Sequence, residues 1–212
     1  MIILKKVIEI IQNVVSRKGS SKVLTFSIPH VFKALQLLGE NKYVSRATFG
    51  KEIHLGEGAV KTLIAHLKEA NIIDSTKSGS FLTEKGSGIV KQLQETVPFE
   101  CDIKKCSIIS GRKNHAIILK NYAHMIKSGL EQRDYAIMYG SSGCITILFQ
   151  NDIFTFPKEE TDCFVNDKKT KRHIIENMRP ENGDVIIISS SDDPFVAEIS
   201  AKNSALWTMA TN

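Results

Sequence analysis

Apolar residues recur at helical spacing in several segments of the first half of the chain. They predict a helix over residues 29–40, a short helix over residues 45–53 with Ser45 as its N-cap, and a longer helix over residues 59–70. A tight, glycine-containing turn separates the second helix from the third. The longer helix has one apolar stripe, and its opposite side is small, polar and cationic. That pattern is typical of a helix that packs on one side and contacts a partner on the other.

A β-hairpin is predicted over residues 74–82, because a polar turn with Lys77 at its tip and Gly79 joins two short segments. A closing helix begins near Thr83. The order of short helix, tight turn, longer helix and basic hairpin is the order of a winged helix-turn-helix. The sequence therefore predicts that residues 1–97 form a winged-helix DNA-binding domain with an added N-terminal helix.

The residues expected to contact duplex DNA lie on the longer helix, at the start of the helix before it, or at the hairpin turn. Lysines there can neutralise phosphates, and small residues let the helix approach the groove floor. No arginine lies on the longer helix, so a bidentate arginine–guanine contact is unavailable there. The full set is Ser45, Arg46, Gly58, Lys61, Thr62, Ala65, His66, Lys68, Lys77 and Ser78.

The charge balance differs between the two halves of the chain. Residues 1–100 hold 14 Lys and Arg against 9 Asp and Glu, whereas residues 101–212 hold 14 of each kind, so the whole formal net charge of +5 lies in the first half. Such an excess is expected of a nucleic-acid binder, although a solvated lysine-rich surface would give the same balance. A docking module without DNA contact is the alternative for this half.

Residues 1–17 form a predicted amphipathic helix, in which Leu4, Ile8, Ile11 and Val15 repeat with 4-3-4 spacing. The segment is too short and too charged to span a bilayer, and no membrane association is expected. The apolar seam either packs on its own domain or forms a homodimer contact, because winged-helix regulators bind two half-sites. Residues 18–21 are predicted to be a loop.

The pattern changes near Pro98, which marks the predicted domain boundary. Short strands are predicted over residues 106–110, 115–119, 144–149, 153–156 and 185–188, with helices over residues 122–139, 168–178 and 194–209. Because strands alternate with helices, residues 98–212 are expected to form a small α/β domain. The complete chain is then α+β, with a winged helix-turn-helix followed by this domain.

A ligand site is predicted where the apolar strand at residues 185–188 runs into Ser189–Ser190–Ser191–Asp192–Asp193, since ligands gather at such strand-to-helix turns. Asp193 would cap the last helix, with Pro194 as its first residue. Simple capping is the alternative, because two aspartates repel an anion. Arg133 and Asp134 are a second candidate pair, with a surface salt bridge as the alternative.

Catalytic chemistry has no clear signature. There is no glycine-rich phosphate loop, nucleophile elbow or metal-binding helix motif, so no catalytic residue, metal site or cofactor is predicted. Four cysteines without framework spacing favour a reduced, cytoplasmic protein. Three functions stay open: a DNA-binding regulator whose second domain senses a small effector, a small-molecule enzyme with an appended winged helix, and a winged-helix docking module.

Residues 29–97 resemble the N-terminal winged-helix domain of bacterial central glycolytic gene regulators, through LGENKYVSRATFGKEIHLGEGAVKTLIAHLKEANII and FLTEKG. The whole chain looks like uncharacterised archaeal proteins that join such a domain to a small α/β domain of unknown function. The residues that carry this second resemblance are 128–134, Gly140, Gly143, 183–185 and 192–194. The resemblance implies a transcription regulator. The effector domain of the bacterial regulators has no match in residues 98–212, so their sugar-phosphate effector is not carried over.

Overall fold

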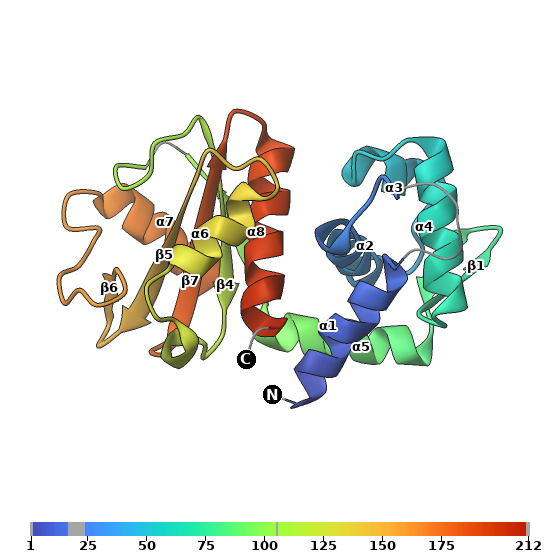
Figure 1. Cartoon of the computed structure of the whole chain (residues 1–212), viewed down its shortest axis with the longest axis horizontal. Helices are drawn as coiled ribbons and strands as arrows, with labels where there is room; N and C mark the ends of the chain where they lie inside the picture. The colour runs from blue at the N-terminus through green and yellow to red at the C-terminus, as the bar shows by residue number, and fades with distance from the viewer. Residues whose placement is uncertain (1, 17–23, 105, 211–212) are drawn as a thin grey trace. The chain divides into compact units, whose positions relative to one another are not determined.

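A computed structural model of the chain describes residues 2–16, 24–104 and 106–210 (Figure 1). The chain divides into two compact units, Met1–Gln92 (unit 1) and Leu93–Asn212 (unit 2). The division falls inside helix α5 (Glu84–Thr96), which ends just before Pro98. The predicted loop at residues 18–21 lies outside the described residues.

Among its described residues, unit 1 has four helices before a two-stranded antiparallel hairpin. They are α1 (Ile2–Val14), α2 (Ile28–Glu40), α3 (Arg46–Glu52) and α4 (Glu57–Glu69), and the hairpin strands are β1 (Ile73–Thr76) and β2 (Gly79–Leu82). All the helices and both strands predicted for residues 29–97 are therefore present. The apolar stripe of α4 is buried as predicted, and it consists of Val60, Leu63, Ile64 and Leu67.

A one-residue bridge joins the hairpin to the segment that precedes α3. The amide and carbonyl groups of Val44 exchange two 2.9 Å hydrogen bonds with those of Ser80. This close approach explains Gly79, whose φ is +130° and at which a Cβ atom would lie 2.8 Å from the Val44 carbonyl oxygen. The bridge fixes the hairpin next to the start of α3.

Helix α1 packs against α2 and α4 within unit 1. Leu4, Ile8 and Ile11 of the predicted seam are buried there, and Val15 is half-buried. The structure thus supports the interpretation that this helix packs on its own domain. The same side chains are not free to form the seam of a coiled-coil dimer.

Unit 2 is built on a five-stranded sheet in which every neighbouring pair of strands is antiparallel. The strand order is β3 (Glu100–Ile103), β4 (Lys113–Leu119), β7 (Asp184–Ser191), β5 (Gly143–Gln150) and β6 (Ile153–Thr155). The α/β prediction was therefore wrong for this unit, which is α+β. Strand β7 lies between β4 and β5, so the helices do not link neighbouring parallel strands. The strand predicted over residues 185–188 is present as part of β7, the central strand of the sheet.

Three local predictions in unit 2 were also wrong. Residues 106–110 form a turn closed by a bridge between Cys106 and Ile109, and the edge strand β3 was missed because it is short and partly charged. The single helix expected over residues 122–139 is a 3₁₀ turn (Ala123–Met125) and a short helix α6 (Leu130–Ile137). Gly129, with φ at +76°, separates the two.

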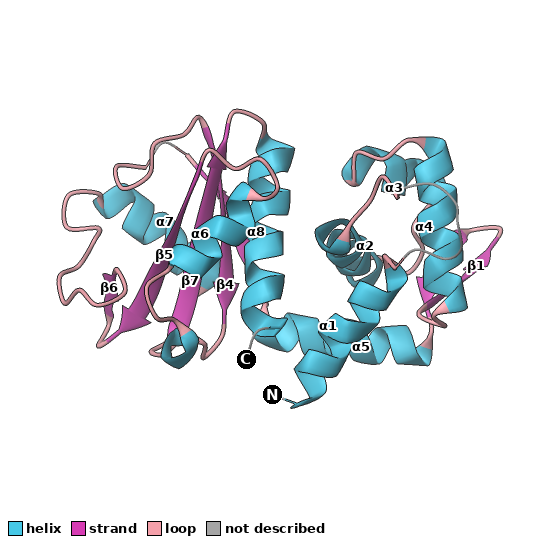
Figure 2. Cartoon of the chain, viewed as in Figure 1, coloured by secondary structure: helices cyan, strands magenta, loops and turns pink. Residues whose placement is uncertain are grey.

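Helices cover both faces of the sheet in unit 2 (Figure 2). Helix α7 (Lys168–Met178) covers an apolar face that includes Ile118, Ile147, Phe154 and Ile186. Helices α6 and α8 (Pro194–Ala210) pack against the opposite face. That second face is more polar, because the alternation of β3 and β4 places Glu100, Asp102 and His115 on it.

Candidate functional site

The outer side of α4 offers an exposed surface in unit 1. Gly58, Lys61 and Ala65 are exposed, as the sequence predicts for a face that contacts a partner. Thr62 is half-buried, and its hydroxyl group donates a 3.0 Å hydrogen bond to the carbonyl oxygen of Gly58 one turn earlier. The methyl group of Ala65 and the backbone at Gly58 leave room for close approach of a second molecule.

Both lysines expected to bind phosphates already have a carboxylate partner. Lys61 Nζ lies 2.8 Å from Glu57 on the same helix, and Lys68 Nζ lies 2.9 Å from Asp74 on β1. Hydrogen bonds from these lysines lower the pKa of Glu57 and of Asp74. All four side chains are exposed to solvent, where ion pairs contribute little stability and exchange easily.

His66 was predicted to contact a DNA base, and in the structure its side chain contacts other parts of unit 1. Its ring nitrogen Nδ1 lies 2.7 Å from the carbonyl oxygen of Val14, and its ring packs edge-on against Phe26 at 5.9 Å. Because Nδ1 donates to this carbonyl, His66 ties α4 to the end of α1. His66 thus has a structural contact in unit 1, and its contact with a base stays a prediction.

The other residues predicted to contact DNA lie at two exposed places. Ser45 is the N-cap of α3, where its hydroxyl oxygen accepts a 3.0 Å hydrogen bond from the amide of Thr48, and Arg46 next to it is exposed. Lys77 and Ser78 are exposed at the hairpin turn. Ser45 therefore has a structural task, whereas Arg46 and Lys77 remain available to a partner.

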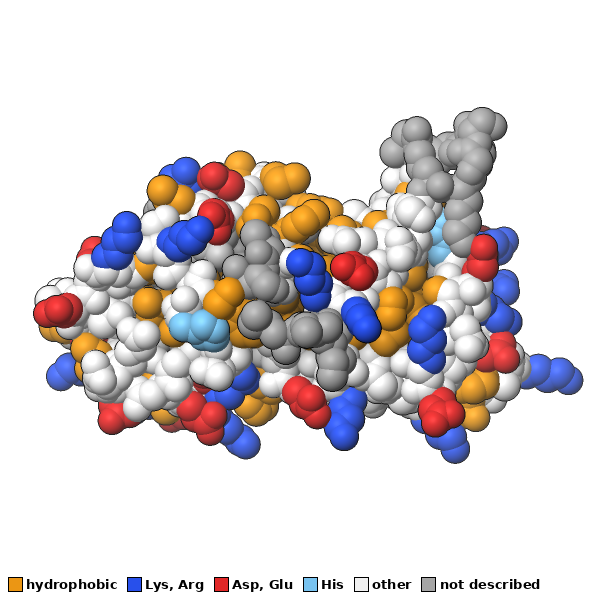
Figure 3. Space-filling model, turned by 60° about the horizontal axis from the view of Figure 1, so that its bottom comes forward, with side chains coloured by type: hydrophobic (Ala, Val, Ile, Leu, Met, Phe, Trp, Pro, Cys, Tyr) orange, Lys and Arg blue, Asp and Glu red, His pale blue; other side chains and the backbone are white. Residues whose placement is uncertain are grey.

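Charges of both signs are mixed on the face of the molecule shown in Figure 3. Lys and Arg side chains alternate there with Asp and Glu side chains, and the residues drawn in colour form no continuous cationic area. On this face, the coloured side chains therefore give no broad basic patch.

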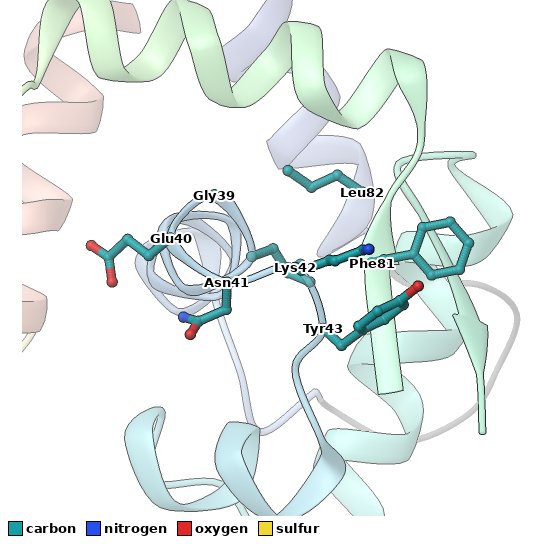
Figure 4. A pocket seen from close by; sticks show the side chains of 8 residues that line it. Gly39, Glu40, Asn41, Lys42, Tyr43, Phe81 and Leu82 are labelled. Carbon is teal, nitrogen blue, oxygen red and sulfur yellow. The ribbon is translucent and has the colours of Figure 1, made fainter. Parts of the chain in front are cut away.

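Unit 1 also has a cavity of about 310 Å³ between the end of α2 and strand β2 (Figure 4). Tyr43 and Phe81 meet there edge to face, with ring centroids 5.9 Å apart, and Lys42 Nζ lies 5.7 Å from the Tyr43 ring centroid. Sequence reasoning missed this cluster because its members are far apart in the chain. The bridge between Val44 and Ser80 brings them together.

The three serines predicted to bind a ligand in unit 2 are buried in strand β7. The hydroxyl group of Ser189 donates to Ser141 at 2.9 Å, and that of Ser190 donates to Asn114 Oδ1. Ser191 accepts a 3.3 Å hydrogen bond from the amide of Asp193. The prediction that these hydroxyl groups face a ligand was wrong, because the sheet extends three residues beyond the apolar run and absorbs them.

The charged members of the predicted ligand site are at the surface. Asp193 caps α8 by accepting hydrogen bonds from the amides of Phe195 and Val196, as the capping alternative predicts. The exposed Asp192 lies 3.6 Å from Arg112. Arg133 pairs with its neighbour Asp134 at 3.1 Å on α6, which is the surface salt bridge named as the alternative. The described contacts bring neither of these two residues to Asp192.

A buried charge cluster on the polar face of the sheet was not predicted from the sequence. Lys202 of α8 is fully buried and donates to both carboxylate oxygens of Glu100, and Glu198 lies 3.3 Å from the same ammonium group. His115 is also buried, with Nδ1 2.9 Å from Asp102 and Nε2 3.6 Å from Glu100. The spacing of Glu198 and Lys202 was the available signal, but it reads equally as an exposed helical pair.

The protonation states of this cluster follow from its contacts. Burial raises the pKa of Glu100, but the ammonium group of Lys202 and the ring of His115 outweigh burial and hold that pKa well below its usual range. For His115, burial favours the neutral ring, but the carboxylates of Asp102 and Glu100 raise its pKa above the usual value. The cluster therefore favours a charged imidazolium between two carboxylates.

Other kinds of site find little support in the described residues. Within residues 2–16, 24–104 and 106–210, no group of three or more His, Cys, Asp or Glu side chains is arranged to hold a metal ion. All four cysteines are free, and burial raises the pKa of each thiol above its usual value. No helix in the same ranges is long and apolar enough to cross a membrane.

Comparison with known proteins matches the two parts of the chain separately. Residues 31–88 match the family described as the PH0730-like N-terminal domain, and residues 109–209 match a domain of unknown function, DUF4443. The two matched segments do not overlap. No curated protein matches the chain.

Among solved structures, the chain is similar to the hypothetical protein PH0730 from Pyrococcus horikoshii OT3. The TM-score is 0.69 at 25% sequence identity, and the match covers 85% of this chain and 91% of that chain. The expected likeness to uncharacterised two-domain proteins is thereby confirmed. The likeness of residues 29–97 to the DNA-binding domain of the glycolytic regulators stays a prediction.

Proposed function

We propose that unit 1 is a winged helix-turn-helix domain that binds duplex DNA, and that the chain is a transcription regulator. The observation that carries this proposal is the bridge between Val44 and Ser80, which places the hairpin beside a helix pair whose second helix, α4, has one exposed side. In a winged helix, a short strand before the first helix of this pair, here α3, pairs with the wing in this way. The order of elements in unit 1 supports the same assignment.

In this proposal α4 enters the major groove, and the hairpin turn lies over the neighbouring phosphates or the minor groove. Gly58 and Ala65 allow close approach, while Lys61 and Lys77 bind phosphates. Arg46, at the start of α3, is a further exposed cation of unit 1. Thr62 is the main polar side chain of the middle of α4, so direct base recognition is sparse and DNA shape contributes to specificity.

The pairing of Lys61 with Glu57 has a direct consequence for binding. A phosphate near Lys61 must displace or repel the Glu57 carboxylate, whose charge lies on the same face of α4. The exposed pair is weak, so exchange is feasible at small cost. Lys68 is less useful, because its pairing with Asp74 links α4 to β1.

The test is fluorescence anisotropy of the full chain with a labelled pool of random duplex DNA at several salt concentrations. Lys61→Ala and Lys77→Ala should each weaken binding to all sequences and lower the salt dependence by about one counterion. Lys127→Ala removes the same charge from unit 2 and serves as the matched control. Equal affinity in all three variants and the unchanged chain would contradict direct contact by α4 and the hairpin.

In the same proposal unit 2 senses a small effector, and the chain acts as a homodimer on two half-sites. The dimer contact would use a surface other than Leu4, Ile8 and Ile11, which are buried within unit 1. A small-molecule enzyme and a docking module are the alternatives. Turnover of a substrate would favour the enzyme, and absence of salt-dependent DNA binding would favour docking.

A further inference from the structure

Unit 2 has a cavity of about 310 Å³ between the β3–β4 connection and the start of α8. Its lining residues are Asp102, Ile103, Lys104, Arg112, Lys113, Asn114, Pro194 and Ala197. The size is at the lower end of the range for small-ligand sites. None of the serines predicted to bind a ligand lines it, so the cavity is a different site from the one expected from the sequence.

Two positive charges of this cavity have no carboxylate partner among the described residues. Lys104 and Lys113 are exposed and take part in no described ion pair, whereas Arg112 lies 3.6 Å from Asp192. Asp102 is the one carboxylate of the lining, and one of its oxygens is occupied by His115 Nδ1. The unpaired charge of the cavity lining is therefore +2, carried by Lys104 and Lys113.

The rim of the cavity is connected to the buried charge cluster through Asp102. His115 lies between Asp102 and Glu100 of β3, and α8 contributes Lys202 and Glu198 to the same cluster. On β7, the residue paired with His115 is Ser189, which carries no charge. While His115 is an imidazolium, it compensates the charge of Asp102, and an anion in the cavity meets less repulsion.

We propose that this cavity binds a small dianion, of the phosphate monoester or dicarboxylate type, held by Lys104 and Lys113. The two lysines match its two charges, and Arg112 can exchange Asp192 for the ligand because that pair is exposed. The proposal deepens the assignment of unit 2 as the sensing part of the regulator and rests on it. Binding is linked to the charge of His115, so it should weaken as pH rises.

The test is isothermal titration calorimetry on the full chain without DNA, with sulfate as the tetrahedral dianion and succinate as the dicarboxylate. Both are compared with chloride at matched ionic strength. Both probes keep their two charges above pH 6.5, so a pH dependence there reports on the protein. We expect saturable binding of one of them, at one site per chain.

The double variant Lys104→Gln/Lys113→Gln should lower the affinity at least tenfold. The control is Lys127→Gln/Lys158→Gln, which makes the same change of charge on exposed lysines of unit 2 outside the cavity, and it should stay within twofold. His115→Gln should remove the pH dependence while leaving binding saturable. An equal loss in both double variants, or no saturable binding of either probe, would overturn the proposal. Neither result would bear on DNA binding by unit 1.

Discussion

The two units contain the same helical ion pair in opposite surroundings. On α4, Glu57 and Lys61 are 2.8 Å apart, with 78% and 55% of their side chains exposed. On α8, Glu198 and Lys202 are 3.3 Å apart, with 16% and 0% exposed. The spacing of four residues is identical, yet only the first pair can be exchanged for a partner from solution.

Burial decides which role such a pair has. An exposed pair contributes about 0.3–0.5 kcal/mol, so the lysine is free to bind a phosphate at small cost. A buried lysine without its partners would cost several kcal/mol, so Lys202 is held by Glu100 and Glu198. In the proposed function, unit 1 carries exposed charge for a partner, whereas unit 2 uses Lys202 and Glu100 within its own fold.

The largest expected effect is the removal of the buried ammonium group. Lys202→Met leaves Glu100 buried without its main partner, and unit 2 should lose about 3–5 kcal/mol of unfolding free energy. The same change on α4, Lys61→Met, should leave the unfolding free energy nearly unchanged, because both side chains of the pair are exposed. Urea denaturation followed by fluorescence of Trp207, the single tryptophan, reports on unit 2, and circular dichroism reports on the helices of both units. Similar losses for the two variants would contradict the distinction.

A second comparison uses two glycines of α5 that differ only in their surroundings. At Gly86 a Cβ atom would lie 2.0 Å from the carbonyl oxygen of Ile72, whereas at Gly88 nothing lies within 4 Å. Gly86→Ala should therefore destabilise unit 1 by about 1–3 kcal/mol or more. Gly88→Ala should stabilise it by up to about 1 kcal/mol through higher helix propensity. Thermal unfolding monitored by circular dichroism checks the opposite signs, and a stable Gly86→Ala protein would show that α5 packs differently.

The two units should also respond to pH in opposite directions. Burial first, and then the charge of Lys33, lowers the pKa of His30 in unit 1 to about 4, so its stabilising contribution is present above pH 6.5 and is lost as pH falls towards 4. Because the pKa of His115 in unit 2 is raised, its contribution is present below pH 6.5 and is lost as pH rises through the folded-state pKa.

Hydrogen exchange measured between pH 4.5 and 8.5, corrected for the intrinsic exchange rate, can follow both units at once. Amides of α2 should lose protection at the acid end, and amides of β4 and β7 should lose it at the alkaline end. His30→Gln and His115→Gln should each remove one of the two trends and leave the other. Parallel trends in both units would contradict the assigned protonation states.

Much of unit 1 could be predicted from the sequence because its signals are local. Helical periodicity, the Ser45 cap and the turn around Gly79 each specify a segment from neighbouring residues. The contacts of His66 could not be predicted, since its partners Val14 and Phe26 come from other parts of the chain. The sequence correctly placed Lys61 and Lys68 on the exposed side of α4, but it did not predict their ion pairs with Glu57 and Asp74.

Unit 2 was harder to predict because its strand order depends on distant pairings. The central place of β7 follows from its apolar sequence, whereas its insertion between β4 and β5 has no local signal. The three serines after Ile188 are polar, so the sequence suggested an exposed turn that could bind a ligand. In the structure, strand β7 continues through them and buries them. The charge cluster joins residues of β3, β4 and α8 that only the folded sheet brings together.

We propose that the exposed pair on α4 exchanges Glu57 for a DNA phosphate. The most direct measurement is the affinity of Glu57→Gln and Lys61→Gln for the same duplex pool at one fixed salt concentration. Glu57→Gln should bind severalfold more tightly, because it removes a repelling charge and frees Lys61, and Lys61→Gln should bind severalfold more weakly. If both affinities equal that of the unchanged chain, or if both change in the same direction, α4 does not lie against the phosphates and the account is wrong.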